Sequence, residues 1–320
     1  MENRNIVFVT GGNTGIGFET VKALLSSPKR YHIFLGSRTP SKGEDAVAEL
    51  KRMVPATEST VEMVQIDVQD DASIDAAVAL VGGKCNRVDT LINNAGAAFD
   101  TSFENDVPQF RAILSKAYDV NVSGAQVMTA AFAPLLIASS SPRLVFVTSG
   151  LSTLSGNAAS FMPPWAPRPV AGWPKKDLFV PQGYQACKAA LNMIMLTWHW
   201  ILREDGVKTF CVSPGFLATN LGGDPERLKA AGAGDPAIGG ELLRRVVEGE
   251  RDDDAGKVVC QQGTQPCRLM SWLNNIFVSH DANPSLPSVA SSFSSEQHAA
   301  PHSTAQHLDG LLSCFRRERD

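Results

Sequence analysis

The fold is decided by Ile6-Val-Phe-Val-Thr10-Gly11-Gly12-Asn13-Thr14-Gly15-Ile16-Gly17. Its first four residues are apolar and mostly β-branched, which is typical of a strand buried on both faces of a parallel sheet. The glycines predict a sharp turn, and residues 18–25 have the apolar spacing of a helix. Because a helix N-terminus attracts anions, the strand, turn and helix predict a pyrophosphate-binding site. A purely structural glycine turn is the alternative interpretation.

The composition narrows the class of protein. The chain has 320 residues, a net charge of −4 and 43% hydrophobic residues, enough for a sizeable core. This charge gives no reason to expect a nucleic acid or an anionic membrane as a partner. A strand begins within five residues of the N-terminus and no apolar run reaches bilayer length, so we expect no signal peptide and a cytoplasmic location. Six scattered cysteines predict free thiols, and we expect no metal site.

The second predicted strand, residues 31–35, ends at Gly36-Ser37-Arg38. In dinucleotide-binding folds the end of this strand meets the adenosine ribose, where an acidic residue binds the 2′-hydroxyl of NAD. This chain has instead the guanidinium of Arg38, a group suited to a 2′-phosphate. We therefore expect NADP(H) rather than NAD(H). The alternative is an ordinary surface arginine that opens the next loop.

Two further predicted strands end in polar or small residues. Residues 61–66 lead into Asp67-Val68, and residues 88–92 lead into Asn93-Asn94-Ala95-Gly96. Asp67 by itself is equally consistent with a helix N-cap. The small and amide residues after the second of these strands are able to pack close to a cofactor, with the amides bonding backbone or ribose.

A tyrosine and a lysine four residues apart carry the predicted chemistry. Tyr184 and Lys188 open an apolar helix that extends to residue 202, so both side chains lie on one helical face. A free tyrosine has a pKa of about 10, and we expect the lysine charge to lower it. Ser149 directly follows another predicted strand, residues 143–148. Open α/β sheets hold their ligands at the carboxyl ends of such strands. Asn121 lies in a predicted helix over 110–122, which it slightly destabilises.

Together these motifs resemble those of the short-chain dehydrogenase/reductase family, over residues 4–266. The resemblance implies an α/β fold with a single Rossmann-type, doubly wound parallel sheet flanked by helices. It also implies carbonyl-reductase-like hydride transfer between nicotinamide and a carbonyl or secondary alcohol. The cofactor-binding residues it implies are Gly11, Asn13, Thr14, Gly15, Ile16, Gly17, Ser37, Arg38, Asp67, Val68, Asn94, Ala95, Gly96, Tyr184, Lys188, Pro214, Gly215, Leu217 and Thr219.

The same resemblance assigns catalytic roles to four residues. Tyr184 gives or takes the proton of the substrate oxygen, and Ser149 orients that oxygen. Lys188 also bonds the ribose hydroxyls. Asn121 distorts its helix and holds a water that connects the proton relay to solvent.

The interval from Ser149 to Tyr184 spans 35 positions and departs from the usual family pattern. The insertion, about 150–183, is rich in prolines and aromatics such as Phe161, Trp165 and Trp173, which we expect to form an apolar pocket wall. A similar insertion in monomeric carbonyl reductases covers an oligomer face, so the resemblance implies a monomer or weak dimer. A disordered surface insertion is the alternative.

The tail, residues 267–320, follows the predicted dehydrogenase domain of residues 1–266. It is rich in Ser, Ala, Pro and His, and we expect it to be poorly ordered, with two short helices over 270–278 and 308–315. Its histidines His298, His302 and His307 fit solvated residues better than metal ligands. An altered gene end would also explain this composition.

Three functions compete. The leading hypothesis is an NADP-dependent oxidoreductase that acts on the carbonyl or alcohol of a hydrophobic small molecule, in secondary metabolism. The alternative is a nucleotide-sensing regulator that keeps the fold without turnover, although such a module does not need Ser149, Tyr184 and Lys188. An isomerase or dehydratase with the same Tyr/Lys pair would carry a larger substrate domain.

Overall fold

Strand β1 (Asn5–Val9) occupies the middle of one sheet. The computed structural model of the chain describes residues 4–100, 107–159, 169–175 and 178–265. The chain divides into two units, Met1–Arg268 and Leu269–Asp320. The predicted tail helices and tail histidines lie outside the described residues, and the domain boundary near residue 266 stays a prediction.

The sheet has eight strands in the order β3-β2-β1-β4-β5-β6-β7-β8. All neighbours pair in parallel except β7 and β8. The strand order reverses between β1 and β4, where open α/β sheets hold their ligands. This confirms the predicted Rossmann-type fold. The other strands are β2 (Tyr31–Ser37), β3 (Thr60–Gln65), β4 (Thr90–Asn93), β5 (Arg143–Val147), β6 (Lys208–Val212), β7 (Val258–Cys260) and β8 (Gly263–Thr264).

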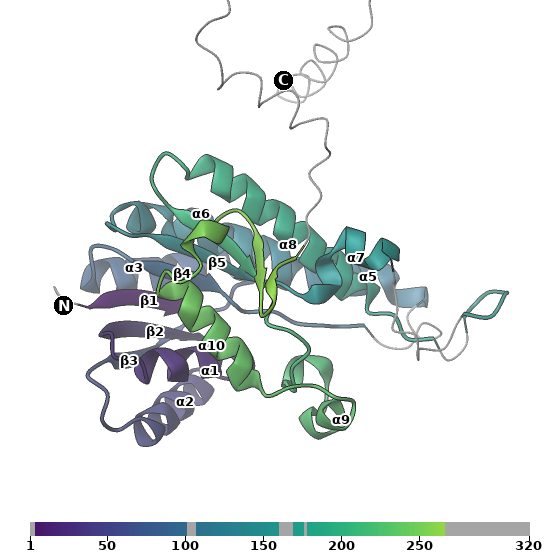
Figure 1. Cartoon of the computed structure of the whole chain (residues 1–320), viewed down its shortest axis with the longest axis horizontal. Helices are drawn as coiled ribbons and strands as arrows, with labels where there is room; N and C mark the ends of the chain where they lie inside the picture. The colour runs from purple at the N-terminus through teal and green to yellow at the C-terminus, as the bar shows by residue number, and fades with distance from the viewer. Residues whose placement is uncertain (1–3, 101–106, 160–168, 176–177, 266–320) are drawn as a thin grey trace, which may run out of the picture. The chain divides into compact units, whose positions relative to one another are not determined.

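Helices cover both faces of the sheet (Figure 1). Helices α1, α2 and α10 pack on one face, and α3, α6 and α8 pack on the other. The α-helices are α1 (Gly15–Leu25), α2 (Pro40–Met53), α3 (Asp71–Lys84), α5 (Phe110–Tyr118), α6 (Gly124–Ile137), α7 (Leu154–Ala159), α8 (Gln182–Ile201), α9 (Pro225–Ala230) and α10 (Pro236–Val247).

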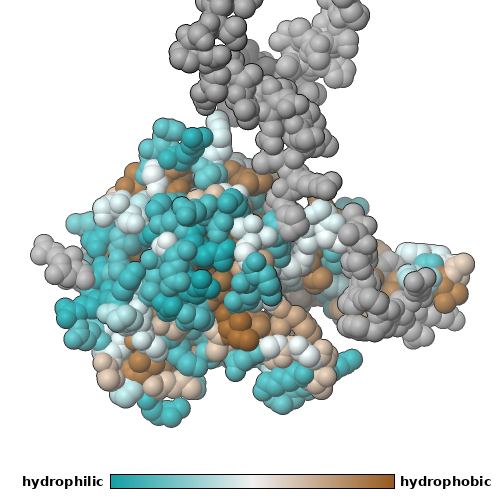
Figure 2. Space-filling view, in the orientation of Figure 1, coloured by the Kyte–Doolittle hydropathy of each residue, from teal (hydrophilic) through white to brown (hydrophobic). Residues whose placement is uncertain are grey.

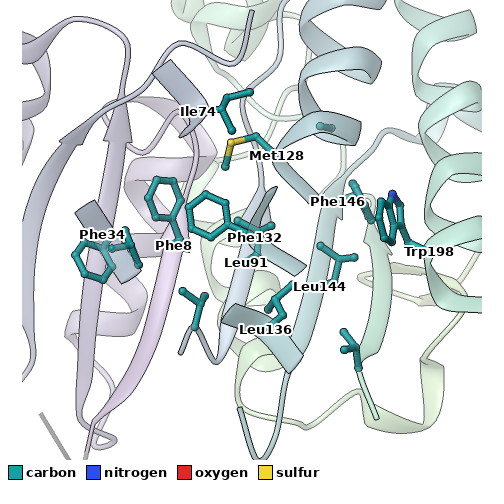
Figure 3. Close-up of a cluster of buried hydrophobic side chains, with 14 of the residues drawn as sticks. Phe8, Phe34, Ile74, Leu91, Met128, Phe132, Leu136, Leu144, Phe146 and Trp198 are labelled. Carbon is teal, nitrogen blue, oxygen red and sulfur yellow. The ribbon is translucent and has the colours of Figure 1, made fainter. Parts of the chain in front are cut away.

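The residues of β1 alternate between the two faces, as a strand period of two requires. Phe8 points toward α6, and its ring centroid lies 4.8 Å from that of Phe132 (Figure 3). Val7 and Val9 pack in the cluster under α1 and α10. Because both faces are buried, residues 6–9 of the strand are all apolar, and this unbroken run is easily recognised in the sequence. On the face seen in Figure 2, the coloured surface is largely hydrophilic, with smaller apolar patches.

The predicted helix 110–122 is longer than expected. It continues from α5 through a π-helical turn (Asp119–Ser123) into α6. The stretch Phe110–Ile137 is apolar and long enough to cross a membrane by length and composition, and an 18-residue window within it has a mean hydropathy of 1.5. This corrects the expectation that no segment reaches that length. Met128, Phe132 and Leu136 pack against the sheet. A helix that belongs to the core of a protein can have the same length and apolar composition as a membrane-spanning helix.

Candidate active site

The glycine turn lies between the end of β1 and the start of α1. Gly11 and Gly15 have φ values of +62° and +57°, a region that L-residues with side chains rarely adopt. A Cβ atom built on Gly17 would lie 2.4 Å from the Gly11 carbonyl oxygen and 2.5 Å from Asn94 Nδ2. The backbone therefore fits only without side chains, and it leaves the N-terminus of α1 open to an anion.

Asn94 and Thr10 hold this turn against β4. Asn94 Nδ2 donates to the carbonyls of Thr10 and Gly11, at 2.8 and 3.1 Å. The hydroxyl of Thr10 accepts from the N–H groups of Asn94 and Ala95, at 3.0 and 2.9 Å. The Asn94 amide thus bonds backbone, one of its two expected uses. The bridging role of Thr10 was missed, although the residue belongs to the recognised motif.

Gly17→Ala is expected to weaken binding of the dinucleotide predicted for this turn about tenfold or more. The new methyl group displaces the Gly11 carbonyl or Asn94 and so shifts the turn that binds the pyrophosphate. The loss of one hydrogen bond from the turn to a charged phosphate corresponds to about a tenfold change in affinity. Fluorescence titration with NADPH measures the change. Gly83→Ala is the matched control, because a Cβ atom there meets nothing within 4 Å. Equal NADPH affinity in Gly17→Ala and Gly83→Ala would show that the close approach is not required.

The end of β2 lies beside the glycine turn, where the Gly12 N–H donates to the Gly36 carbonyl at 2.9 Å. Ser37 is buried, and its hydroxyl donates to the Thr39 carbonyl at 2.9 Å. Arg38 is exposed, and within the described part of the chain no acidic side chain pairs with it. Its guanidinium is therefore available to a phosphate.

Asp67 and Val68 follow β3. The Asp67 carboxylate accepts from the Gln69 N–H at 3.1 Å, whereas the cap of α3 is Asp70, which accepts from the Ala72 N–H at 3.0 Å. The alternative interpretation of Asp67 as the helix cap is therefore wrong. A Cβ atom on Gly124 would lie 2.5 Å from the Val68 carbonyl oxygen, so this loop packs directly on the long helix.

The segment after β6 returns to the glycine turn. Ile16, Pro214 and Leu217 all lie within 3.5 Å of a Cβ atom built on Gly239 of α10. Thr219 lies 3.6 Å from the corresponding position on Gly15. Residues far apart in the sequence are thus neighbours here, and Asn13, Thr14 and Gly215 (φ +109°) belong to the same two segments.

Helix α8 carries Tyr184 and Lys188. Tyr184 is 9% exposed, and its burial raises its pKa to about 12, an effect partly offset by a hydrogen bond with Ser149. Burial also lowers the pKa of Lys188 to about 8. The expectation that Lys188 lowers the tyrosine pKa is wrong here, because the loss of solvation of the phenol outweighs other effects. The Lys188 ammonium lies 5.5 Å from the Tyr184 ring centroid and donates to the Val147 carbonyl at 2.9 Å.

Asn121 lies in the π-helical turn, where the Gly124 N–H donates to the Asp119 carbonyl five residues earlier. Asn121 Nδ2 donates to the carbonyls of Ala97 and Ala117, at 2.7 and 2.8 Å. The expected helix distortion is thus present. A Cβ atom on Gly96 would lie 2.8 Å from Asn121 Oδ1 and 3.3 Å from Lys188 Nζ, so both side chains pack beside Gly96.

A hydrogen-bonded network behind Ser149 was not predicted. Asn192 Nδ2 donates to Ser152 Oγ at 2.9 Å, and Ser152 Oγ donates to the Ser149 carbonyl at 2.6 Å. Asn192 Oδ1 accepts from Thr148 Oγ1 at 2.7 Å. Asn192 lies four residues beyond Lys188, so helical spacing was a usable signal for its position.

The insertion is described only in part. Residues 160–168, including Phe161 and Trp165, lie outside the described residues, and Trp173 is 63% exposed. The expected aromatic pocket wall therefore stays a prediction. Within the described ranges, no group of three or more His, Cys, Asp or Glu side chains is arranged to hold a metal ion.

The glycine turn, the doubly wound sheet and the Tyr184–Lys188 pair are together typical of a dinucleotide-dependent oxidoreductase of the Rossmann class. A family model described as short chain dehydrogenase matches residues 5–161. The chain is 48% identical over 264 residues to the short-chain dehydrogenase/reductase tropE of Talaromyces stipitatus, which covers 82% of this chain and 97% of that protein. It belongs to the short-chain dehydrogenase/reductase family, and is thus an oxidoreductase acting on CH–OH and C=O groups.

Other relatives agree on the family and the fold. The short-chain dehydrogenase/reductase eupG of a Phoma species is 44% identical over 272 residues, covering 82% of this chain and 97% of that protein. The NADPH-bound carbonyl reductase from chicken fatty liver has a similar structure, with a TM-score of 0.68 and 23% identity over 83% of this chain and all of that one. At this identity the likeness shows the fold.

Proposed function

We propose that the chain is an NADPH-dependent reductase of a carbonyl group in a hydrophobic small molecule. One observation carries the proposal: the hydroxyl of Tyr184 is hydrogen-bonded to Ser149, and burial raises the pKa of Tyr184 to about 12. The phenol is therefore protonated at neutral pH and is placed to donate a proton to a carbonyl oxygen bound at Ser149.

The residues present fit the cofactor. The glycine turn packs so closely on Asn94 that Gly17 has no room for a Cβ atom, and Arg38 is free to meet a 2′-phosphate. Pro214 and Ile16 both lie beside Gly239, and Thr219 lies beside Gly15, so the segment after β6 borders the same turn. When bound, NADPH supplies the hydride.

The chain's own residues handle the proton and the substrate oxygen. Ser149 orients the carbonyl oxygen, and Tyr184 donates its phenolic proton to it. The Lys188 ammonium, 5.5 Å from the ring centroid, stabilises the negative charge that the phenol acquires. Asn121 holds Ala97 and so keeps Gly96 packed beside Lys188.

The fungal relatives favour a substrate of secondary metabolism, and the apolar residues of the insertion favour a hydrophobic one. We also propose a monomer or weak dimer in the cytoplasm. Gel filtration that gives a stable tetramer would overturn the proposed oligomeric state.

The test is NADPH oxidation at 340 nm with a panel of quinones, aromatic ketones and aldehydes. Turnover with at least one carbonyl, lost in Tyr184→Phe, supports the proposal. NADPH binding without any turnover favours the nucleotide-sensing regulator. Binding of neither NADPH nor NADH contradicts the cofactor assignment.

Arg38→Ala is expected to raise the KM for NADPH about 10- to 100-fold and to leave that for NADH nearly unchanged. The reason is that charge-assisted hydrogen bonds to a phosphate contribute about 1.5–3 kcal/mol, and 1.4 kcal/mol is about tenfold. Steady-state kinetics with both cofactors measure the ratio. Arg52→Ala, which removes an exposed arginine from the end of α2, the helix that follows Arg38, is the control. A parallel rise in both KM values would contradict a role in phosphate recognition.

A further inference from the structure

The helix that carries Tyr184 receives its cap from another part of the chain. Pro181 precedes α8 and provides no side-chain cap, and the first turn contains no acidic residue. Instead, Asp100 Oδ1 accepts from the Gly183 N–H at 2.8 Å, and Asp100 Oδ2 accepts from the Tyr184 N–H at 3.1 Å. Both carboxylate oxygens are thus bonded to free N–H groups of the first turn, one of which belongs to Tyr184 itself.

Asp100 is held in place from the other side of the site. It lies three residues after Ala97, whose backbone N–H and carbonyl are both bonded to Asn121 in the π-helical turn. Phe99 packs against Ala117, Val122 and Cys187. The segment therefore connects the turn that contains Asn121 with the first turn of α8.

Gly183 leaves the space that this cap requires. A Cβ atom on Gly183 would lie 3.0 Å from Asp100 Oδ1 and 3.5 Å from Ile113 Cγ2. The first distance is shorter than an ordinary van der Waals contact, so a larger residue crowds the carboxylate. Aspartate at 100 and glycine at 183 thus form one structural unit.

We propose that Asp100 is a positioning residue for the reduction, one that sets the orientation of Tyr184 toward Ser149. Tyr184 lies in the first turn of its helix, where the backbone N–H groups have no carbonyl partner within the helix and the end frays. Asp100 replaces those partners, so the phenol is held where its hydrogen bond with Ser149 forms. Asp100 acts through the helix, and this proposal rests on the proposed reductase function.

The first test measures geometry without any substrate. Hydrogen–deuterium exchange of peptides covering residues 182–188 is expected to be clearly faster in Asp100→Ala than in the wild-type protein. Asp70→Ala is the matched control, because Asp70 caps α3 through the same kind of bond, to the Ala72 N–H at 3.0 Å. Unchanged exchange over 182–188 in Asp100→Ala would overturn the proposal even if the chain proves not to be a reductase.

The second test measures catalysis. Asp100→Ala is expected to lower kcat about 10- to 100-fold, since small misplacements of a reacting group have effects of that size. NADPH affinity stays the same, and the primary isotope effect with 4-deuterated NADPH increases, which a loss of folded protein alone would not produce. Asp100→Asn keeps one acceptor oxygen, so its kcat is expected to lie between those of the wild type and Asp100→Ala. An unchanged kcat and isotope effect in Asp100→Ala would overturn the proposal.

Gly183→Ala tests the same contact from the helix side. Its effect on kcat and that of Asp100→Ala are expected to be non-additive in the double variant, because both act on one contact. Fully additive effects would show that the two residues act separately and would overturn their pairing.

Discussion

Tyr184→Phe is expected to lower kcat about 10²- to 10⁴-fold, the usual contribution of a positioned general acid. Phenylalanine keeps the ring, which is buried in α8, and removes only the hydroxyl that bonds with Ser149. The hydroxyl makes no contact with the glycine turn, so we expect the Kd for NADPH to stay within about twofold of the wild-type value, a difference of less than about 0.5 kcal/mol. Single-turnover measurements separate the reduction step from product release.

Tyr118→Phe is the control for this substitution, since it removes a hydroxyl from a tyrosine that is 49% exposed in α5. We expect it to leave kcat unchanged. A Tyr184→Phe protein that retains wild-type turnover would show that the proton comes from another group or from water. A variant that loses NADPH binding together with turnover would leave the tyrosine a structural part of the cofactor site, and would contradict the role of proton donor.

Lys188→Met is expected to lower kcat/KM about 10²- to 10⁴-fold, while making the folded protein more stable at pH 7. Lys188 is only 3% exposed, and its pKa is lowered from 10.5 to about 8 by burial. That shift corresponds to about 3 kcal/mol of destabilisation when the amine is charged. Methionine leaves the Val147 carbonyl without this donor, which costs about 1 kcal/mol, so a net gain of about 2 kcal/mol remains.

The difference in the free energy of unfolding between the wild type and Lys188→Met is expected to change with pH. Between about pH 8 and 10.5 the unfolded chain binds more protons at Lys188 than the folded chain, so wild-type stability rises with pH relative to the variant. The gap in the free energy of unfolding seen at pH 7 therefore closes as the pH approaches 10. Urea unfolding at pH 7, 8.5 and 9.5 measures it. A Lys188→Met protein that is less stable at every pH would contradict the cost of burying the charge.

The pH dependence of the wild-type kcat/KM is expected to reflect the protonation of Lys188. Above about pH 8 the Lys188 amine loses its proton, and carbonyl reduction slows because the phenolate that forms at Tyr184 loses its neighbouring charge. This fall in kcat/KM is absent from the residual activity of Lys188→Met. A wild-type profile that stays flat to pH 10 would contradict the link.

The sheet and the polar ends of its strands are the parts that the sequence reveals best. Val7 and Val9, like the other central strand residues, are buried on both faces, so an unbroken apolar run identifies them. Tyr184 and Lys188 share a helical face by spacing alone, and the structure brings both to the ends of the central strands. Helices α2 and α10 were not predicted, although their buried residues recur at helical spacing, as Ala46 and Leu50 do in α2 and Leu243 and Val247 do in α10.

Other features depend on distances that no local pattern contains. Asp100 meets the start of α8 from 83 residues away, and Asn121 is bonded to Ala97 from 24 residues away. The pKa of Tyr184 was expected to fall because the spacing shows the neighbouring charge. The spacing does not show how little water reaches the phenol, and that factor decides the direction.

The insertion between the serine and the tyrosine is anchored at both ends. Ser152 is fixed to Asn192 at its beginning, and Gly183 is fixed to Asp100 at its end. Loops between fixed ends tolerate changes of length at small entropic cost. We therefore expect that replacing residues 154–180 with the corresponding segment of another reductase changes the choice of carbonyl substrate and leaves Tyr184 and Lys188 in place, so this interval is where engineering of a biocatalyst would begin.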